Sequence, residues 1–106
     1  MKPLTSEWIR PSFNAVCFHA QQCVEKYLKA VLQENEIAFQ KVHDLEVLLN
    51  QCLIFIPDLE KLREDAQKLN VFAVEVRYPG FEAQRKDAEE ALLSMEKIVE
   101  ALKEYF

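Results

Sequence analysis

The stretch "SFNAVCFHAQQCVEKYLKAVLQENE", residues 12–36, decides the fold because it has the pattern of one long amphipathic helix. On a helical wheel of about 3.6 residues per turn, its apolar side chains share one broad arc. The members of this arc are Val16, Ala20, Cys23, Val24, Tyr27, Leu28, Ala30, Val31 and Leu32. An apolar arc wider than half the circumference is typical of a helix packed against several others. Ser12 or Asn14 is placed to cap its first turn.

The opposite arc of this helix is polar and includes Glu25. It contains a stripe whose members recur at spacings of three and four residues: His19, Gln22, Lys26 and Lys29. Such a stripe is either a solvated face, in which Glu25 and Lys29 form an i, i+4 ion pair, or part of a ligand site. Phe18 lies among these polar residues, which makes it a candidate interface residue.

Three further segments have helical periodicity: 43–52, 58–78 and 86–106. Their expected core positions are Leu45, Leu48, Leu49 and Cys52; then Leu59, Leu62, Ala66, Leu69, Ala73 and Val76; and finally Ala88, Leu92, Met95, Ile98 or Val99, Leu102 and Phe106. Asp44 is placed to cap the first segment, and Asp87 with Glu90 has the spacing of a capping box at the last. Because the connections are short, we expect one domain over residues 1–106: an all-α, antiparallel up-and-down helical bundle of four to five helices.

The composition supports a helical domain and argues against several classes of protein. The chain has one glycine and four prolines among 106 residues, which is few turn formers for a sheet protein. Its formal net charge of −5 weighs against bulk nucleic-acid binding, which needs a positive surface. No apolar run is long enough to span a membrane, and Cys17, Cys23 and Cys52 lack the spacing of a zinc site. We therefore expect a cytoplasmic protein with reduced cysteines and with no metal or cofactor.

The stretch "EVRYPGF", residues 75–81, holds the single glycine of the chain and suggests a site. A Pro-Gly pair is enough to end a helix, since a residue before proline leaves helical geometry. Arg77 and Tyr78, which precede this pair, are therefore either packing residues of a helix terminus or ligand-binding groups. The stretch "KVHDL" likewise places His43 and Asp44 at a helix start, where they serve either as local capping groups or in a site.

Three of these stretches together resemble a known family. "FHAQQCVEKYLKAVL", "HDLEVLL" and "RYPG", in this order from Phe18 to Gly80, are similar to the motifs of the HEPN domains of bacteria and archaea. The final amphipathic helix fits this resemblance as well. The resemblance implies a helical bundle that is often dimeric and often encoded beside a minimal nucleotidyltransferase. It also implies nucleotide binding, and many branches of the family are ribonuclease toxins.

Two departures from the family pattern limit what the resemblance implies. Ribonuclease branches have an arginine that is followed, after four to six residues, by a histidine. No histidine has that spacing after any of the four arginines: Arg10, Arg63, Arg77 and Arg85. We therefore assign no catalytic residue, and Tyr78 is not supported as an acceptor of nucleotidyl groups. The first helix of the family is also shortened, either because this is a short member or because a segment between Arg10 and Pro11 is missing.

From the motifs and the resemblance we expect a nucleotide-binding module that acts with a minimal nucleotidyltransferase, in a toxin–antitoxin-like pair. Arg77 would bind phosphate oxygens bidentately, and Tyr78 would stack on a base. His43, neutral beside a helix start, would donate one hydrogen bond. The other candidate ligand-binding residues are Asp44, Lys26, Lys29, His19 and Gln22. The alternatives are a homodimeric interaction module with Phe18 at its interface and, less favoured, a metal-independent ribonuclease.

Overall fold

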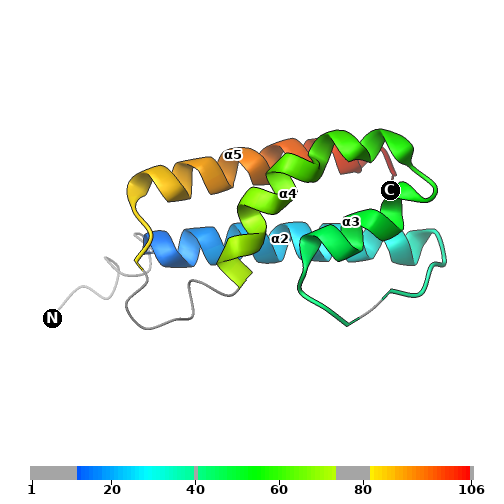
Figure 1. Cartoon of the computed structure of the whole chain (residues 1–106), viewed down its shortest axis with the longest axis horizontal. Coiled ribbons are helices and arrows are strands. Elements are labelled where there is room, and N and C mark those ends of the chain that lie inside the picture. The colour runs from blue at the N-terminus through cyan, green and yellow to red at the C-terminus, as the bar shows by residue number, and fades with distance from the viewer. Residues whose placement is uncertain (1–11, 40, 74–81, 106) are drawn as a thin grey trace, which may run out of the picture.

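The computed structural model describes residues 12–39, 41–73 and 82–105, which form a bundle of helices (Figure 1). No strand occurs in these three ranges, and the all-α helical bundle expected from the sequence is confirmed. The α-helices are α2 (Phe13–Glu34), α3 (Leu45–Leu53), α4 (Arg63–Asn70) and α5 (Arg85–Leu102). Short 3₁₀ segments accompany them: η1 (Pro57–Leu62), η2 (Val71–Ala73) and η4 (Lys103–Tyr105).

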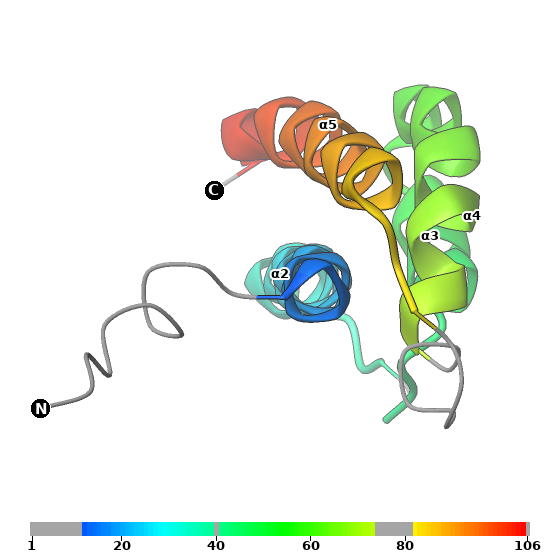
Figure 2. The same ribbon diagram turned by 90° about the vertical axis from the view of Figure 1, so that its left-hand side faces the viewer.

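The path of the chain between α2 and α3 determines where the candidate site lies. Viewed end-on, α3 and α4 lie on one side of the pair formed by α2 and α5 (Figure 2). The helices α3, α4 and α5 alternate in direction, as an up-and-down connection requires (Figure 1). The segments 35–39 and 41–44 instead lead back along α2, so that α2 and α3 run the same way. This return places His43 beside the middle of α2.

The core is filled mainly by leucine side chains, which come from all four α-helices and from η1. The largest fully buried apolar side chains are Leu28, Leu32, Leu45, Leu48, Leu49, Leu59, Leu69, Ile98 and Leu102. Burying one such side chain contributes about 1.5–3 kcal/mol, so this cluster holds the bundle together. The core faces predicted for segment 43–52, and for segment 58–78 as far as Ala73, are confirmed.

The three cysteines are free thiols that behave as packing residues. Cys17 and Cys52 are fully buried, and Cys23 is half-buried. Burial raises the pKa of the Cys52 thiol to about 11, so that it stays protonated at neutral pH. Cysteines in this state act as small apolar side chains.

The buried face of α5 differs from the one predicted. Leu92 was expected in the core but is 39% exposed, whereas Ala91 and Ser94 are buried. The reason is that α5 packs against α4 as well as α2, and small side chains on this face allow the close approach. The Ser94 hydroxyl donates a hydrogen bond to the buried Asp65 carboxylate of α4 at 2.9 Å. Leu92 is therefore turned to the surface, next to the exposed Leu93.

Two of the predicted helix caps are confirmed and one is wrong. Ser12 caps α2 and Asp44 caps α3, each by accepting hydrogen bonds from backbone N–H groups of the first turn. The capping box was expected at Asp87 and Glu90, but the N-cap of α5 is Gln84. The backbone N–H of Gln84 donates to the Asp87 carboxylate at 2.8 Å, so Asp87 holds the third helical position instead of the cap.

The segment 58–78 was predicted as one continuous helix, and the structure divides its described part into η1, α4 and η2. Pro57 begins η1, consistent with the break expected there. The helix tightens to 3₁₀ geometry at Val71 and Phe72, which are weaker helix formers than Gln67, Lys68 and Leu69. The predicted end of this helix near Arg77 lies outside the described residues.

Candidate functional site

A buried carboxylate is the centre of a polar cluster between α2 and the segment that leads to α3. Glu25 is only 6% exposed, so its assignment to the outer polar arc of the helix was wrong. Its two carboxylate oxygens lie 3.0 and 3.1 Å from Nδ1 of His43. Lys29 Nζ lies 2.9 Å from one of the same oxygens, which is the i, i+4 pair expected if the polar stripe is a solvated face. A charge with this little exposure needs such partners, because desolvation without them is costly.

Gln21, one turn before Glu25 on α2, anchors the backbone of the same segment. This side chain is fully buried, and its Nε2 donates to the main-chain carbonyl of His43 at 2.9 Å. The same Nε2 lies 3.5 Å from a carboxylate oxygen of Glu25. Gln22 donates in turn to the amide oxygen of Gln21 at 3.5 Å. The residues of α2 therefore hold His43 by its backbone as well as by its ring.

Opposing effects set the ionisation of Glu25. Burial raises the pKa of its carboxyl group, while the hydrogen bonds and charges of Lys29 and His43 lower that pKa by a larger amount. The net pKa of Glu25 lies below its ordinary value. The carboxyl group is therefore ionised at neutral pH, and the cluster combines one fixed negative charge with an ammonium and an imidazole.

The ammonium group of Lys29 retains hydrogen-bonding capacity. An ammonium has three N–H donors, and the hydrogen bond to Glu25 uses one of them. The Lys29 side chain is 24% exposed, and its Nζ lies 5.9 Å from the centre of the Phe39 ring, within the range of a cation–π contact. Lys29 is thus positioned by a carboxylate and a ring, with donors left for a ligand oxygen.

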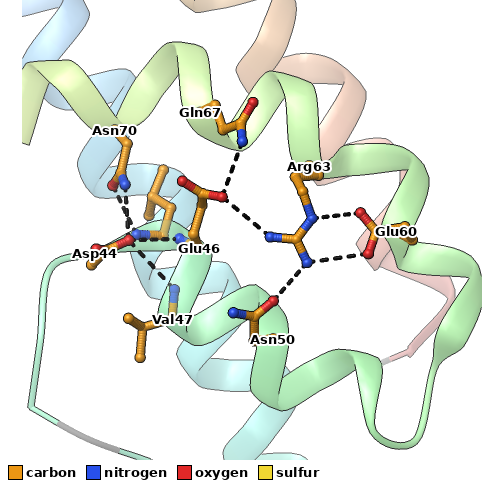
Figure 3. Close-up of polar contacts among 9 residues, drawn as sticks. Asp44, Glu46, Val47, Asn50, Glu60, Arg63, Gln67 and Asn70 are labelled. Atoms are coloured by element: carbon orange, nitrogen blue, oxygen red, sulfur yellow. Dashed lines mark hydrogen bonds and ion pairs between the residues drawn. The ribbon is translucent and has the colours of Figure 1, made fainter.

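A second polar network lies on the outer side of α3 and α4, and its central cation uses four of its five N–H donors within the protein (Figure 3). Nε and Nη2 of Arg63 donate to the two carboxylate oxygens of Glu60. Nη1 donates to Glu46 at 3.2 Å, and Nη2 also donates to Asn50 at 2.6 Å. Glu46 accepts a further hydrogen bond from Gln67 at 3.1 Å. Arg63 therefore joins α3, η1 and α4 to one another, which is a structural role.

Asp44 belongs to this second network although it follows His43 directly in the sequence. Its Oδ1 caps α3 and also accepts from Nδ2 of Asn70 at 2.8 Å (Figure 3). The amide oxygen of Asn70 accepts from the backbone N–H of Leu45 at 2.8 Å. Asp44 therefore ties α3 to α4, and the residue that orients the His43 ring is Glu25.

Two members of the expected stripe form none of the cluster's hydrogen bonds in the described ranges. Lys26 lines an open pocket of about 520 Å³ together with Tyr27, Ala30 and Lys103. His19 is exposed, and its ring lies 5.9 Å from that of Phe18. Phe18 itself is half-buried, so it is less exposed than its position among polar residues indicated. Of the stripe, only Lys29, through Glu25, and Gln22, through Gln21, are linked to His43 within the described ranges.

The sequence interpretation missed Glu25 and Gln21 as site residues. Their signal is a spacing of four residues, Gln21, Glu25 and Lys29, along the border of the apolar arc. Polar side chains at such a border can turn inward when another segment supplies hydrogen-bonding partners. Here His43 is that partner, through its carbonyl oxygen and its ring. Arg77 and Tyr78, the other expected site residues, lie outside the described residues.

The described ranges contain no group of three or more histidine, cysteine, aspartate or glutamate side chains that could hold a metal ion. Among the same residues, no helix has both the length and the apolar character needed to cross a membrane.

Comparison with known proteins agrees with the motifs quoted from the sequence. The model of the HEPN domain family matches residues 9–105. The curated protein "Putative toxin MJ1304" of Methanocaldococcus jannaschii is 30% identical over 104 residues, a match that covers 83% of this chain and 68% of that protein. No solved structure gives a significant match. The chain belongs to the HEPN domain family.

Proposed function

We propose that this HEPN domain is a nucleotide-binding module that acts with a minimal nucleotidyltransferase in a toxin–antitoxin-like pair. Membership of the family supports this proposal, and so does the similarity to the archaeal protein named "Putative toxin MJ1304". The observation that carries it is the meeting of His43 and Lys29 on the buried carboxylate of Glu25. Two polar groups from distant parts of the chain are thereby fixed at one place.

The chemistry of this cluster suits a phosphorylated ligand. Lys29 supplies a positive charge with unused donors, and phosphate oxygens are strong acceptors for such groups. The imidazole of His43, with a side chain that is 61% exposed, contacts both oxygens of the same carboxylate. A bidentate contact of Arg77 with phosphate and stacking of Tyr78 on a base remain part of the proposal.

Nucleotide binding is tested by thermal shift. ATP, GTP and AMP at millimolar concentration are added to the protein, and a ligand present at about 100 times its Kd adds about 2.7 kcal/mol of stability. We expect at least one of them to raise Tm, and the rise to be smaller in Lys29→Ala. Lys61→Ala, which removes an exposed lysine of η1, is the matched control and should respond like the wild type. If no nucleotide raises Tm of the wild type, the proposed binding function is wrong.

The partner is tested by affinity purification from the native cell, followed by identification of the bound proteins. A nucleotidyltransferase that co-purifies at stoichiometric amounts supports the proposed pair. Repeated purification without any nucleotidyltransferase contradicts it. An unidentified protein in the eluate does not count in favour of the pair.

An interaction module without a ligand is the second candidate, and the exposed Leu92 and Leu93 of α5 favour it. In that case the protein is a homodimer, and the half-buried Phe18 is a candidate interface residue. Light scattering decides: a dimer weakened by Phe18→Ala, together with no thermal shift from any nucleotide, supports this alternative. A wild type that stays monomeric at high concentration removes it.

The ribonuclease alternative has no support from the arginine–histidine spacing. Incubation of a labelled RNA without metal tests it directly. Cleavage that is lost in His43→Ala would establish nuclease activity at this cluster, and we expect no cleavage.

A further inference from the structure

The hydrogen bond between Glu25 and His43 fixes which nitrogen of the imidazole bears the proton. Nδ1 lies 3.0 and 3.1 Å from the two carboxylate oxygens. An ionised carboxylate can only accept hydrogen bonds, so Nδ1 must be the donor. A neutral imidazole has one N–H, and the proton on Nδ1 therefore leaves Nε2 with a lone pair.

The position of the ring is held from α2 at two points. Gln21 donates a hydrogen bond to the main-chain carbonyl of His43 at 2.9 Å, and the Glu25 carboxylate accepts one from its ring. Because Gln21 and Glu25 are four residues apart on one helix, they lie one above the other on the same face. Both side chains are buried, which limits their motion. His43 is therefore held firmly although much of its own side chain is exposed.

Nε2 of His43 has no hydrogen bond within the described ranges, and the side chain is 61% exposed. The neutral ring thus offers an acceptor to a ligand, not a donor as expected from the sequence alone. Lys29, on the same carboxylate, offers N–H donors and a positive charge. This pair of groups is complementary to a molecule that has a hydroxyl group near an anionic oxygen.

A ribonucleotide has both features, because its ribose hydroxyls lie near its phosphate groups. We propose that Glu25 is a positioning residue that fixes the Nδ1–H tautomer of His43, so that Nε2 accepts a hydrogen bond from a ribose hydroxyl while Lys29 binds a phosphate oxygen. This inference rests on the proposed nucleotide binding and adds that the site selects ribonucleotides over dideoxynucleotides.

The tautomer is tested by NMR of the imidazole nitrogens at about pH 8, where ordinary imidazoles are neutral. The chain has two histidines, so the His19→Ala variant leaves only the His43 signals. The ¹⁵N shifts should show a protonated Nδ1 and an unprotonated Nε2. A protonated Nε2 in this protein overturns the inference, and no variant of Glu25 is needed for that result.

Glu25→Gln tests whether the carboxylate sets the tautomer. An amide can donate as well as accept, so the ring is free to become the Nε2–H tautomer. We expect the ¹⁵N shifts of His43 to move toward that form, whereas Glu46→Gln, in the second network, should leave them unchanged. Identical tautomer populations in Glu25→Gln and wild type overturn the positioning role.

Ligand selection is tested by calorimetry with ATP and 2′,3′-dideoxy-ATP. Loss of one hydrogen bond to a neutral group weakens binding roughly threefold to tenfold, and we expect this ratio in the wild type. The ratio should fall to about one in His43→Ala, which removes the imidazole that bonds the hydroxyl. Equal affinity of the wild type for both nucleotides overturns the inference and leaves the proposed function standing. No binding of either nucleotide overturns both, and the imidazole spectrum still decides the tautomer separately.

Discussion

Two polar networks lie a short distance apart on this domain, and they use their hydrogen-bonding groups differently. The network around Arg63 joins α3, η1 and α4, and four hydrogen bonds engage its guanidinium (Figure 3). The cluster around Glu25 also joins two segments, but Lys29 and His43 each keep groups that bond nothing in the described ranges. Charge alone does not indicate a site. A site differs from a structural network in that most of its hydrogen-bond donors and acceptors are left for a ligand.

The largest effect is expected in the Glu25 cluster. Lys29→Ala removes a charged donor to phosphate, and hydrogen bonds to charged groups contribute about 1.5–3 kcal/mol. This corresponds to roughly a tenfold to hundredfold loss of affinity for ATP, measured by calorimetry. Lys26→Ala should have a much smaller effect, because Lys26 lines the separate pocket with Lys103. Equal losses in the two variants would mean that the stripe, not the cluster, binds the nucleotide.

The next effect concerns stability in the second network. Asp44→Ala removes the N-cap of α3 and the hydrogen bond from Asn70. Loss of an N-cap costs about 1 kcal/mol, which lowers Tm by roughly 4–8 °C in a domain of this size. Asp44→Asn keeps a capping oxygen and should lose far less in calorimetric unfolding. A Tm that does not change in Asp44→Ala would show that the cap contributes little to the fold.

The pH dependence of stability tests the charge of Glu25. Its folded-state pKa is lowered relative to the ordinary value of 4.5. A carboxyl group of this kind adds stability that is fully present above the unfolded-state pKa and is lost as the pH falls through the folded-state pKa. We expect Tm to fall on acidification below about pH 4.5, and less steeply in Glu25→Gln. Identical Tm profiles for the two proteins would contradict the ion pairs of Glu25.

The smallest effect is expected for Arg63→Ala. Its ion pairs with Glu46 and Glu60 are partly or largely exposed, and such pairs contribute little because water and salt screen them. A small fall in Tm that shrinks at high salt, with unchanged affinity for ATP, fits a structural role. A loss of ATP affinity would mean that Arg63 takes part in the site after all.

The sequence predicted most of the fold because periodic apolar positions act independently of their partners. The buried faces of α3 and α4 agree with the prediction, because the spacing of apolar residues within each segment is enough to identify them. The face of α5 did not, because Ser94 is buried by its hydrogen bond to Asp65 on another helix. The pattern of apolar residues in a sequence does not show which polar side chains of two helices will be buried together.

The candidate site was predictable only in part, for the same reason. His43 and Lys29 were identified from their motifs, but Glu25 was assigned to solvent. Its burial depends on the position of segment 41–44 beside α2, which no local sequence pattern specifies. The tautomer that we infer for His43 follows from that burial, so it could not be predicted from the sequence either.

The central claim is that the Glu25 cluster, and not the Arg63 network, binds a nucleotide. The most direct measurement is a titration of the ¹⁵N-labelled protein with ATP, followed by amide chemical shifts. We expect the shifts to change at Glu25, Lys29 and residues 41–44, and the amides of Glu46, Arg63 and Gln67 to stay in place. Changes confined to those three residues or to the pocket of Lys26 and Lys103, or no changes at millimolar ATP, would contradict the claim.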